Sequence, residues 1–394
     1  MTDTAIAQTD ERPIRLGMVG GGQGAFIGAV HRIAARLDGH YTLVAGALSS
    51  DPGRARASGL EVGLAPDRCY GSFEEMARAE AERPDGIEAV SIVTPNHLHV
   101  PVAAAFLKAG IHVICDKPLA ARMEDAQMLA ELVAASGKLF VLTHNYTGYP
   151  MVRQARAMVE NGEIGDIRVV QLEYPQDWLT EPIELEGQKQ AAWRTDPQRS
   201  GAGGCIGDIG THAWNLGAFV TGLQAERLAA DLDSFVPGRR LDDNAHILVR
   251  YKPKGKAPPA KGMIWASQVA PGNENGLRMR IYGTRGGLEW AQENPNLLRH
   301  SPFGEPVRLI TRGGAGANAA AAAVTRIPGG HPEGYLEAFA TVYTEAAAVI
   351  RAMRLEQPAP TFLLPGIYDG LEGMRFIDAC VRSSRADGAW VEWA

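Results

Sequence analysis

Short apolar runs alternate with amphipathic segments along the first 145 residues of the chain. Ile14–Gly20 is an apolar run that ends in glycine, and from Phe26 to Leu37 the apolar residues recur at helical spacing, which predicts a strand, a turn and a helix. Further strands are predicted at Leu43–Leu48, Ile87–Val93, Ile111–Cys115 and Leu139–Thr143, and further helices at Val100–Ala109 and Arg122–Ala135. This alternation predicts an α/β domain with a doubly wound parallel sheet, whose ligand crevice lies at the C-terminal ends of the strands.

The pattern changes after a predicted helix at Met151–Asn161, where apolar segments shorten and strands dominate. Apolar and polar residues alternate from Leu277 to Tyr282, which predicts a strand with one buried and one polar face, typical of antiparallel sheets. The other strands predicted here are Ile167–Tyr174, Leu228–Phe235, His246–Tyr251, Met263–Val269 and a continuation of the alternating strand to Gly283, followed by helices at Tyr335–Arg354 and Leu371–Ala386.

These patterns predict three parts: a disordered polar tail at residues 1–12, a first domain at 13–145 and a second domain at 146–394. Two stretches of biased composition lie in the second domain. Lys252–Lys261 is interpreted as a basic hairpin turn, and Gly313–Val324 as a flexible loop or a short helix.

Composition narrows the class of protein. Apolar residues make up 45% of the 394 residues and the net charge is −6, which argues against disorder and against nucleic acid or an acidic membrane as partners. No apolar stretch is long enough to predict a membrane-spanning helix and the N-terminus lacks the apolar core of a signal peptide, so a cytoplasmic protein is expected. The four cysteines are scattered without a CxxC pair, which argues against a disulfide framework or a zinc site. The 45 glycines exceed the usual share of about 7% and indicate turns and close backbone approaches.

A glycine-rich turn follows the first predicted strand. Gly20, Gly22 and Ala25 fit the G-x-G-x-x-G/A pattern, in which the backbone approaches a pyrophosphate and the next helix offers free N–H groups. Gln23, Gly24 and Phe26 belong to the same turn. The alternative is a turn without a ligand, but its place between a strand and a helix favours binding of NAD or NADP.

The end of the second strand bears on the choice between the two cofactors. An acidic residue at this point would bind the adenosine ribose and repel a 2′-phosphate, but the chain has Ser49 there, with Ser50 beside it. The two hydroxyls with Arg54 nearby could hold a phosphate, which favours NADP slightly. Arg54 could equally be a solvated residue of the next helix.

Two further polar motifs, TPNHLH at residues 94–99 and DKP at 116–118, directly follow predicted strands. A fourth motif, GGCIGDIGTH, spans Gly203–His212. The glycine turn and these three motifs occur in the order found in the Gfo/Idh/MocA family, the glucose–fructose oxidoreductase and inositol dehydrogenase group. The chain resembles this family over nearly its whole length. The departures are Asp116, where the family usually has glutamate, and Ser49, where it usually has an acid.

The resemblance implies an N-terminal Rossmann domain and a C-terminal α/β domain with a large, mostly antiparallel, open-faced sheet. It also implies that this face forms a homodimer or homotetramer and that the late helices pack back onto the Rossmann domain. By the same resemblance the cofactor is expected to contact Thr94, Pro95, Asn96, His99, Asp116, Lys117 and Asn145.

Three titratable residues are expected to carry the chemistry: Lys117, Asp208 and His212. Asp208 and His212 are four residues apart, so on a helix they share one face. His212 suits a general base that removes a hydroxyl proton as hydride leaves, and Lys117 would place a positive charge beside the developing alkoxide. Asp208 would hold His212 or a second substrate hydroxyl. The alternative is that Asp208 caps the helix and His212 lies in the core; a metal site is not expected.

These residues predict an NAD(P)-dependent oxidoreductase that transfers hydride between the nicotinamide and a secondary alcohol or ketone of a sugar, glycoside or cyclitol. Alternatives are a redox-neutral glycoside-modifying enzyme with tightly bound NAD and a non-catalytic dinucleotide sensor. The side chains expected at the polyhydroxylated substrate are Lys117, Tyr146, Trp193, Arg194, Asp208, His212 and His331.

Overall fold

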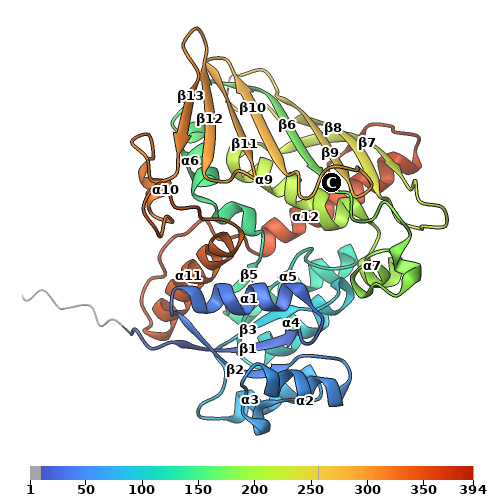
Figure 1. Cartoon of the computed structure of the whole chain (residues 1–394), viewed down its shortest axis with the longest axis vertical. Coiled ribbons are helices and arrows are strands. Elements are labelled where there is room, and N and C mark those ends of the chain that lie inside the picture. Colours follow the sequence, from blue (N-terminus) through green and yellow to red (C-terminus); the bar gives the residue numbers. More distant parts are fainter. Residues whose placement is uncertain (1–9, 256, 394) are drawn as a thin grey trace, which may run out of the picture.

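The computed structural model describes residues 10–255 and 257–393, and it has two domains stacked end to end (Figure 1). The predicted tail lies outside the described residues except for Asp10–Arg12. Asp10 pairs with Arg354 of a late helix at 2.7 Å, so the chain is tied to the body of the protein from this residue on.

The first domain is built on a parallel sheet with the order β2-β1-β3-β4-β5. Its strands are β1 (Ile14–Gly20), β2 (Tyr41–Ala47), β3 (Ala89–Val93), β4 (His112–Cys115) and β5 (Phe140–Leu142). The helices between them are α1 (Phe26–Leu37), α2 (Pro52–Glu61), α3 (Phe73–Glu82), α4 (His99–Lys108) and α5 (Met123–Ser136). This is the predicted doubly wound sheet, and its strand ends face the second domain.

The second domain contains a large sheet with the order β13-β12-β11-β10-β6-β9-β8-β7-β14, antiparallel except where β6 and β9 pair in parallel. Its strands are β6 (Ile167–Pro175), β7 (Ala225–Asp233), β8 (Asn244–Tyr251), β9 (Lys261–Ser267), β10 (Arg278–Gly283), β11 (Gly286–Ala291), β12 (Leu297–Pro302), β13 (Arg308–Thr311) and β14 (Val391–Glu392). The mostly antiparallel sheet implied by the resemblance is therefore confirmed.

Helices cover one face of this sheet and leave the other open (Figure 1). The covering helices are α6 (Pro150–Glu160), α9 (Thr211–Thr221) and α12 (Ile367–Arg385). Of the short helices, α10 (Ala319–Ala322) packs against α6, and α7 (Lys189–Arg194) packs against α8 (Pro197–Ser200), which also contacts residues Asn96–Leu98 of the first domain. Helix α11 (Tyr335–Arg354) leaves the second domain and packs against α1 of the first. In this contact the ring of Tyr343 of α11 lies edge-on to the rings of His31 in α1 and Tyr41 in β2.

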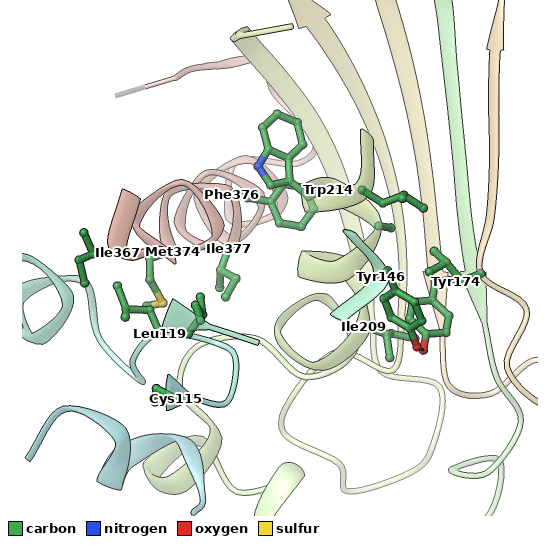
Figure 2. Packing of buried hydrophobic residues seen from close by; sticks show 14 of the residues in the cluster. Cys115, Leu119, Tyr146, Tyr174, Ile209, Trp214, Ile367, Met374, Phe376 and Ile377 are labelled. Carbon is green, nitrogen blue, oxygen red and sulfur yellow. Dashed lines mark hydrogen bonds between the residues drawn. The ribbon is translucent and has the colours of Figure 1, made fainter. Parts of the chain in front are cut away.

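The core runs through both domains without a break. Cys115 and Leu119 of the first domain lie close to Met374 and Ile377 of α12 (Figure 2). Between these two residues of α12, Phe376 stacks on Trp214 of α9 with ring centroids 5.3 Å apart (Figure 2). Apolar residues of the first domain and of α12 are buried in one cluster, so the two domains share part of their stability.

The structure contains strands that the sequence did not predict. β11 to β13 form hairpins in a region where no strand was predicted beyond Gly283, because glycine and polar residues hide their alternation. The Gly/Ala-rich segment 313–324, for which a loop or a short helix was predicted, forms a turn followed by the short helix α10, in which the side chain of Asn318 accepts from the backbone N–H of Ala321.

Candidate active site

A single cleft of about 1190 Å³ follows the C-terminal ends of β1, β2, β3 and β4 and continues between the two domains. One wall is the glycine turn and strand ends of the first domain. The other is formed by side chains of β6, α7, α9 and the loops beside β10 and β11. The cleft lies where a parallel α/β sheet is expected to bind its ligand.

The glycine turn lies at one end of the cleft, and Gly20, Gly22, Gln23, Ala25 and Phe26 line it. A Cβ atom on Gly22 would lie 2.5 Å from the carbonyl oxygen of Leu48, so only glycine fits there. The start of α1 has no side-chain cap and its N–H groups are free for an anion. Gly24 has a φ of +74° and supports the turn without lining the cleft.

The predicted phosphate-binding residues Ser49, Ser50 and Arg54 line the same end of the cleft. The carboxylate of Asp51 is turned away, because it caps α2 by accepting a hydrogen bond of 2.7 Å from the backbone N–H of Arg54. Glu74 of α3 also reaches this end of the cleft.

Of the other predicted cofactor residues, Thr94, Pro95, Asn96, Asp116, Lys117 and Asn145 line the middle of the cleft. His99 does not line it. Its two ring nitrogens lie 2.7 and 2.9 Å from the carbonyl oxygens of Pro118 and Thr94. His99 therefore links the TPNHLH motif to the DKP motif outside the cleft.

Lys117 and Asp208 meet across the cleft. The Lys117 ammonium donates to the Asp208 side-chain oxygen Oδ1 at 3.1 Å and to the backbone carbonyl oxygen of Asp208. The other oxygen of the carboxylate accepts from Arg194 Nε at 3.1 Å and from Gln268 Nε2 at 2.9 Å. Although burial favours the neutral form, the two cations hold the pKa of Asp208 well below its usual range. The cluster thus has two cations to one anion.

Asp208 lies in a π-helical turn (Ile206–Gly210) that runs directly into α9, rather than in the regular helix expected from the sequence. Such turns are frequent at functional sites. Asp208 and His212 both line the cleft, but the carboxylate is occupied by Lys117, Arg194 and Gln268. No hydrogen bond joins Asp208 to His212 within the described structure, so of the two predicted roles of Asp208 the one that holds His212 is not observed, and the contact with a second substrate hydroxyl stays a prediction.

His212 lies in an aromatic cage. Its ring centroid is 4.7 Å from that of Tyr146 and 5.6 Å from that of His144. Burial, together with the nearby Lys117 cation, lowers the pKa of His212 well below 6.5, so the ring is neutral at neutral pH. Its Nδ1 atom is buried without a hydrogen-bond partner among the described residues. A neutral imidazole in a cleft is able to accept a proton.

A polar network that the sequence did not predict lies on the wall formed by the second domain. The hydroxyl of Tyr146 bonds that of Tyr174, which donates to Asn275 Oδ1 at 2.8 Å, and Asn275 Nδ2 donates to Gln292 at 2.9 Å. Gln176 also donates to Asn275, at 2.8 Å. Tyr146 was predicted, but Tyr174, Gln176, Asn275 and Gln292 carry no local motif and meet only through the pairing of β6 with β10.

Trp193 and Arg194 of α7 line the cleft as predicted for substrate contacts. The Arg194 guanidinium lies over the Trp193 ring at 4.3 Å and faces that of Trp178 at 5.9 Å. His331 is not brought to the cleft within one chain. It is exposed in the loop before α11, where its carbonyl oxygen accepts from Arg312.

The middle of the cleft fits a nicotinamide dinucleotide. Thr94 Oγ1 and Asn145 Nδ2 are buried polar atoms without partners in the described part of the chain, and both residues line the cleft. A donor and a hydroxyl of this kind suit the carboxamide of a nicotinamide, and the glycine turn suits a pyrophosphate. Across residues 10–255 and 257–393 there is no cluster of three or more metal-ligating side chains and no helix long and apolar enough to cross a membrane.

Comparison with known proteins agrees with this geometry. Residues 14–144 match the family described as "Oxidoreductase family, NAD-binding Rossmann fold", and residues 152–289 match the "GFO/IDH/MocA C-terminal domain". The chain is 37% identical to an uncharacterized oxidoreductase of Bacillus subtilis over 97% of both chains.

Solved structures that are similar over nearly the whole chain include the following two. An oxidoreductase from Sinorhizobium meliloti is 61% identical, with a TM-score of 0.88 over 97% of this chain and 100% of that one. An inositol dehydrogenase homolog from Azotobacter vinelandii, complexed with NAD+, is 38% identical, with a TM-score of 0.91 over 97% and 98%.

The fold and the cleft are those of an NAD(P)-dependent dehydrogenase. More particularly, the chain belongs to the Gfo/Idh/MocA family of oxidoreductases.

Proposed function

We propose that the protein oxidises a secondary hydroxyl of an uncharged cyclitol or sugar, with Lys117 and His212 as its catalytic residues. The observation that carries this proposal is the meeting of Lys117, Asp208 and His212 in the cleft, opposite a wall of amides and aromatic rings. Neutral amides and hydroxyls suit a polyol, whose hydroxyls both donate and accept hydrogen bonds.

The relatives support this substrate class. One solved relative is an inositol dehydrogenase homolog complexed with NADH and myo-inositol, at 37% identity, and another is a levoglucosan dehydrogenase complexed with NADH and levoglucosan, at 25%. The stacked Trp193 and Arg194 beside the cleft would contact the ring of such a compound.

The chemistry divides between the cofactor and the chain. Bound nicotinamide supplies the site that accepts or returns the hydride. Lys117, fixed by Asp208, donates to the substrate oxygen and stabilises the negative charge that develops there. His212, neutral because it is buried, takes the hydroxyl proton. Asp208 stays ionised and holds Lys117 and Arg194 in place.

The cofactor in this proposal is NAD or NADP, with NADP slightly favoured. The support is that Ser49, Ser50 and Arg54 line the adenosine end of the cleft while Asp51 is occupied in capping α2. The solved relatives with NAD+ and NADH support the other cofactor.

The same proposal includes a homo-oligomer that forms through the open face of the large sheet. It also places the protein in the cytoplasm. This face exposes apolar side chains that a partner would cover: Leu248 at 51% exposure, Leu309 at 60%, Met263 at 40% and Val169 at 39%. Met263→Arg, at the centre of the face, should convert the assembly to monomers in light scattering, whereas a wild-type chain that is already monomeric would contradict this part.

The test is the absorbance of reduced cofactor during incubation with myo-inositol, levoglucosan or D-xylose, with NAD and NADP in parallel. A steady rise with at least one polyol supports the proposal. Product without net cofactor change would instead indicate the redox-neutral route, and cofactor binding without any product would indicate a sensor. A large preference for NAD would contradict the role given to Ser49 and Arg54.

A further inference from the structure

A carboxylate from a distant part of the chain holds the start of the helix that carries Asp208 and His212. The helical run begins after Gly204, which has no side chain to cap it. Asp242, just before β8, supplies the cap instead. Its Oδ1 accepts from the backbone N–H of Gly204 at 2.6 Å, and its Oδ2 accepts from the N–H of Ile206 at 2.8 Å and the thiol of Cys205 at 3.0 Å.

The two segments also touch through their backbones. The N–H of Cys205 donates to the carbonyl oxygen of Asp242 at 2.8 Å, and a Cβ atom on Gly204 would lie 2.1 Å from that oxygen. Asp208 belongs to the first turn held in this way, because its own N–H donates to the carbonyl oxygen of Gly204 at 2.9 Å. The position of Asp242 therefore sets the position of Asp208.

The next residue, Asp243, also contacts residues that hold Asp208 in place. Its carbonyl oxygen accepts from the N–H of Gln268 at 2.8 Å, and the side chain of Gln268 donates to Asp208. Its buried carboxylate pairs with Arg239 at 3.0 Å, and Arg239 in turn pairs with Glu184, in the segment that leads to α7. The two aspartates thus link the helix of Asp208 to the wall that carries Arg194.

We propose that Asp242 is a positioning residue for the dehydrogenase reaction. Its carboxylate fixes the first helical turn so that Asp208 meets Lys117 and His212 faces the cleft. Asp242 does not itself line the cleft, so it acts only through these residues. The inference rests on the proposed roles of Lys117, Asp208 and His212.

Asp242→Asn tests the inference, because the amide keeps one acceptor and turns a donor toward a second N–H group. We expect kcat with myo-inositol, or with the fastest polyol of the panel, to fall about 10- to 100-fold, since a small misplacement of reacting groups has an effect of this size. The Kd of NADH, measured by fluorescence, stays unchanged, because the glycine turn is untouched. The isotope effect on kcat with ring-deuterated substrate rises, because hydride transfer becomes slower than product release.

Two further variants separate positioning from loss of stability. Ser383→Ala removes a buried hydroxyl that accepts from the N–H of Ala230 at 2.8 Å, away from the cleft, and should lower the Tm without changing kcat. In the double variant Lys117→Met with Asp242→Asn, kcat should fall by less than the product of the two single effects, because Asp242 acts in part through the contact of Asp208 with Lys117. Gly204→Ala, which pushes the helix away from Asp242 with the carboxylate intact, should lower kcat as Asp242→Asn does.

The outcomes distinguish the two proposals. Wild-type kcat in Asp242→Asn or Gly204→Ala, together with an inactive Lys117→Met, would overturn the positioning role and leave the proposed function in place. An equal fall of kcat in Asp242→Asn and Ser383→Ala at equal loss of Tm would overturn it as well. An active Lys117→Met would instead overturn the proposed function.

Discussion

The two walls of the cleft are built in different ways. The wall that we propose for the cofactor, the cofactor wall, is made by a short run of backbone, Gly20 to Ala25, whose shape depends on glycines that no side chain can replace. The wall that we propose for the substrate, the substrate wall, is made by side chains from several elements, of which Tyr146, Tyr174, Asn275 and Gln292 form one hydrogen-bonded network. Binding a pyrophosphate requires close backbone approach, whereas binding a polyol requires convergent polar side chains.

This difference implies that substitutions can impair the function of one wall without affecting that of the other. Changes in the glycine turn should weaken cofactor binding, and changes around Lys117 or Asn275 should slow turnover or weaken substrate binding while the cofactor still binds.

The largest effect is expected from Lys117→Met, which keeps the length of the side chain and removes its charge. We expect kcat to fall about 100- to 1000-fold, the range found when one donor to a developing oxyanion is removed. The Kd of NADH should be unchanged in a fluorescence titration. Lys108→Met, on the exposed side of α4, is the matched control and should behave as the wild type. A Lys117→Met enzyme of near-normal kcat would remove the lysine from the mechanism.

Gly22→Ala should give the next largest effect, on the other wall. The new methyl group would meet the backbone oxygen of Leu48 at 2.5 Å, and that oxygen cannot move without displacing β2. We expect the Kd of NADH to rise about 100-fold, equivalent to about 2.7 kcal/mol. Gly53→Ala makes the same substitution nearby in α2, where the added atom has an ordinary contact of 3.4 Å, and should leave the Kd unchanged. Equal Kd values for the two variants would contradict the close approach at Gly22.

Asn275→Ala should give a smaller effect, confined to the substrate. It removes the acceptor of Tyr174 and Gln176 and the donor to Gln292. We expect the KM for the polyol to rise about 10-fold, as for the loss of one or two hydrogen bonds, with the Kd of NADH unchanged. Asn273→Ala, in the same loop but outside the network and the cleft, is the control. A KM that stays at the wild-type value would exclude Asn275 from the substrate wall.

How far these walls could be predicted from the sequence follows from how they are built. The strand Ile14–Gly20, the glycine turn and the positions of Lys117, Asp208 and His212 depend on local patterns and were predicted. The substrate network was missed because residues of β6 and the loops beside β10 and β11 are brought together only by sheet pairing. The π-helical turn at Asp208 was missed because its cap, Asp242, is far away in the sequence.

The smallest effect concerns stability rather than activity. Burial lowers the pKa of His31 and of His112 to about 4 and that of His144 to about 3. Because the unfolded chain binds protons on these histidines near pH 6.5 and the folded chain does not, stability must fall as the pH drops below neutrality. Each histidine should cost about 0.7 kcal/mol between pH 7 and pH 6. Urea unfolding at both pH values measures this, and His31→Gln should reduce the fall by one histidine's share. Stability that is constant or rises over this range would contradict the neutral burial of these rings.

The most direct test of the central claim is a crystal structure of the protein with NAD+ and the polyol that it oxidises. We expect one hydroxyl of the polyol to lie within hydrogen-bond distance of both Lys117 Nζ and a ring nitrogen of His212, with the rest of the ring against Asn275, Gln292 and Trp193. A polyol that binds elsewhere, with Lys117 and His212 both out of reach of its hydroxyls, would contradict the assignment of the catalytic residues.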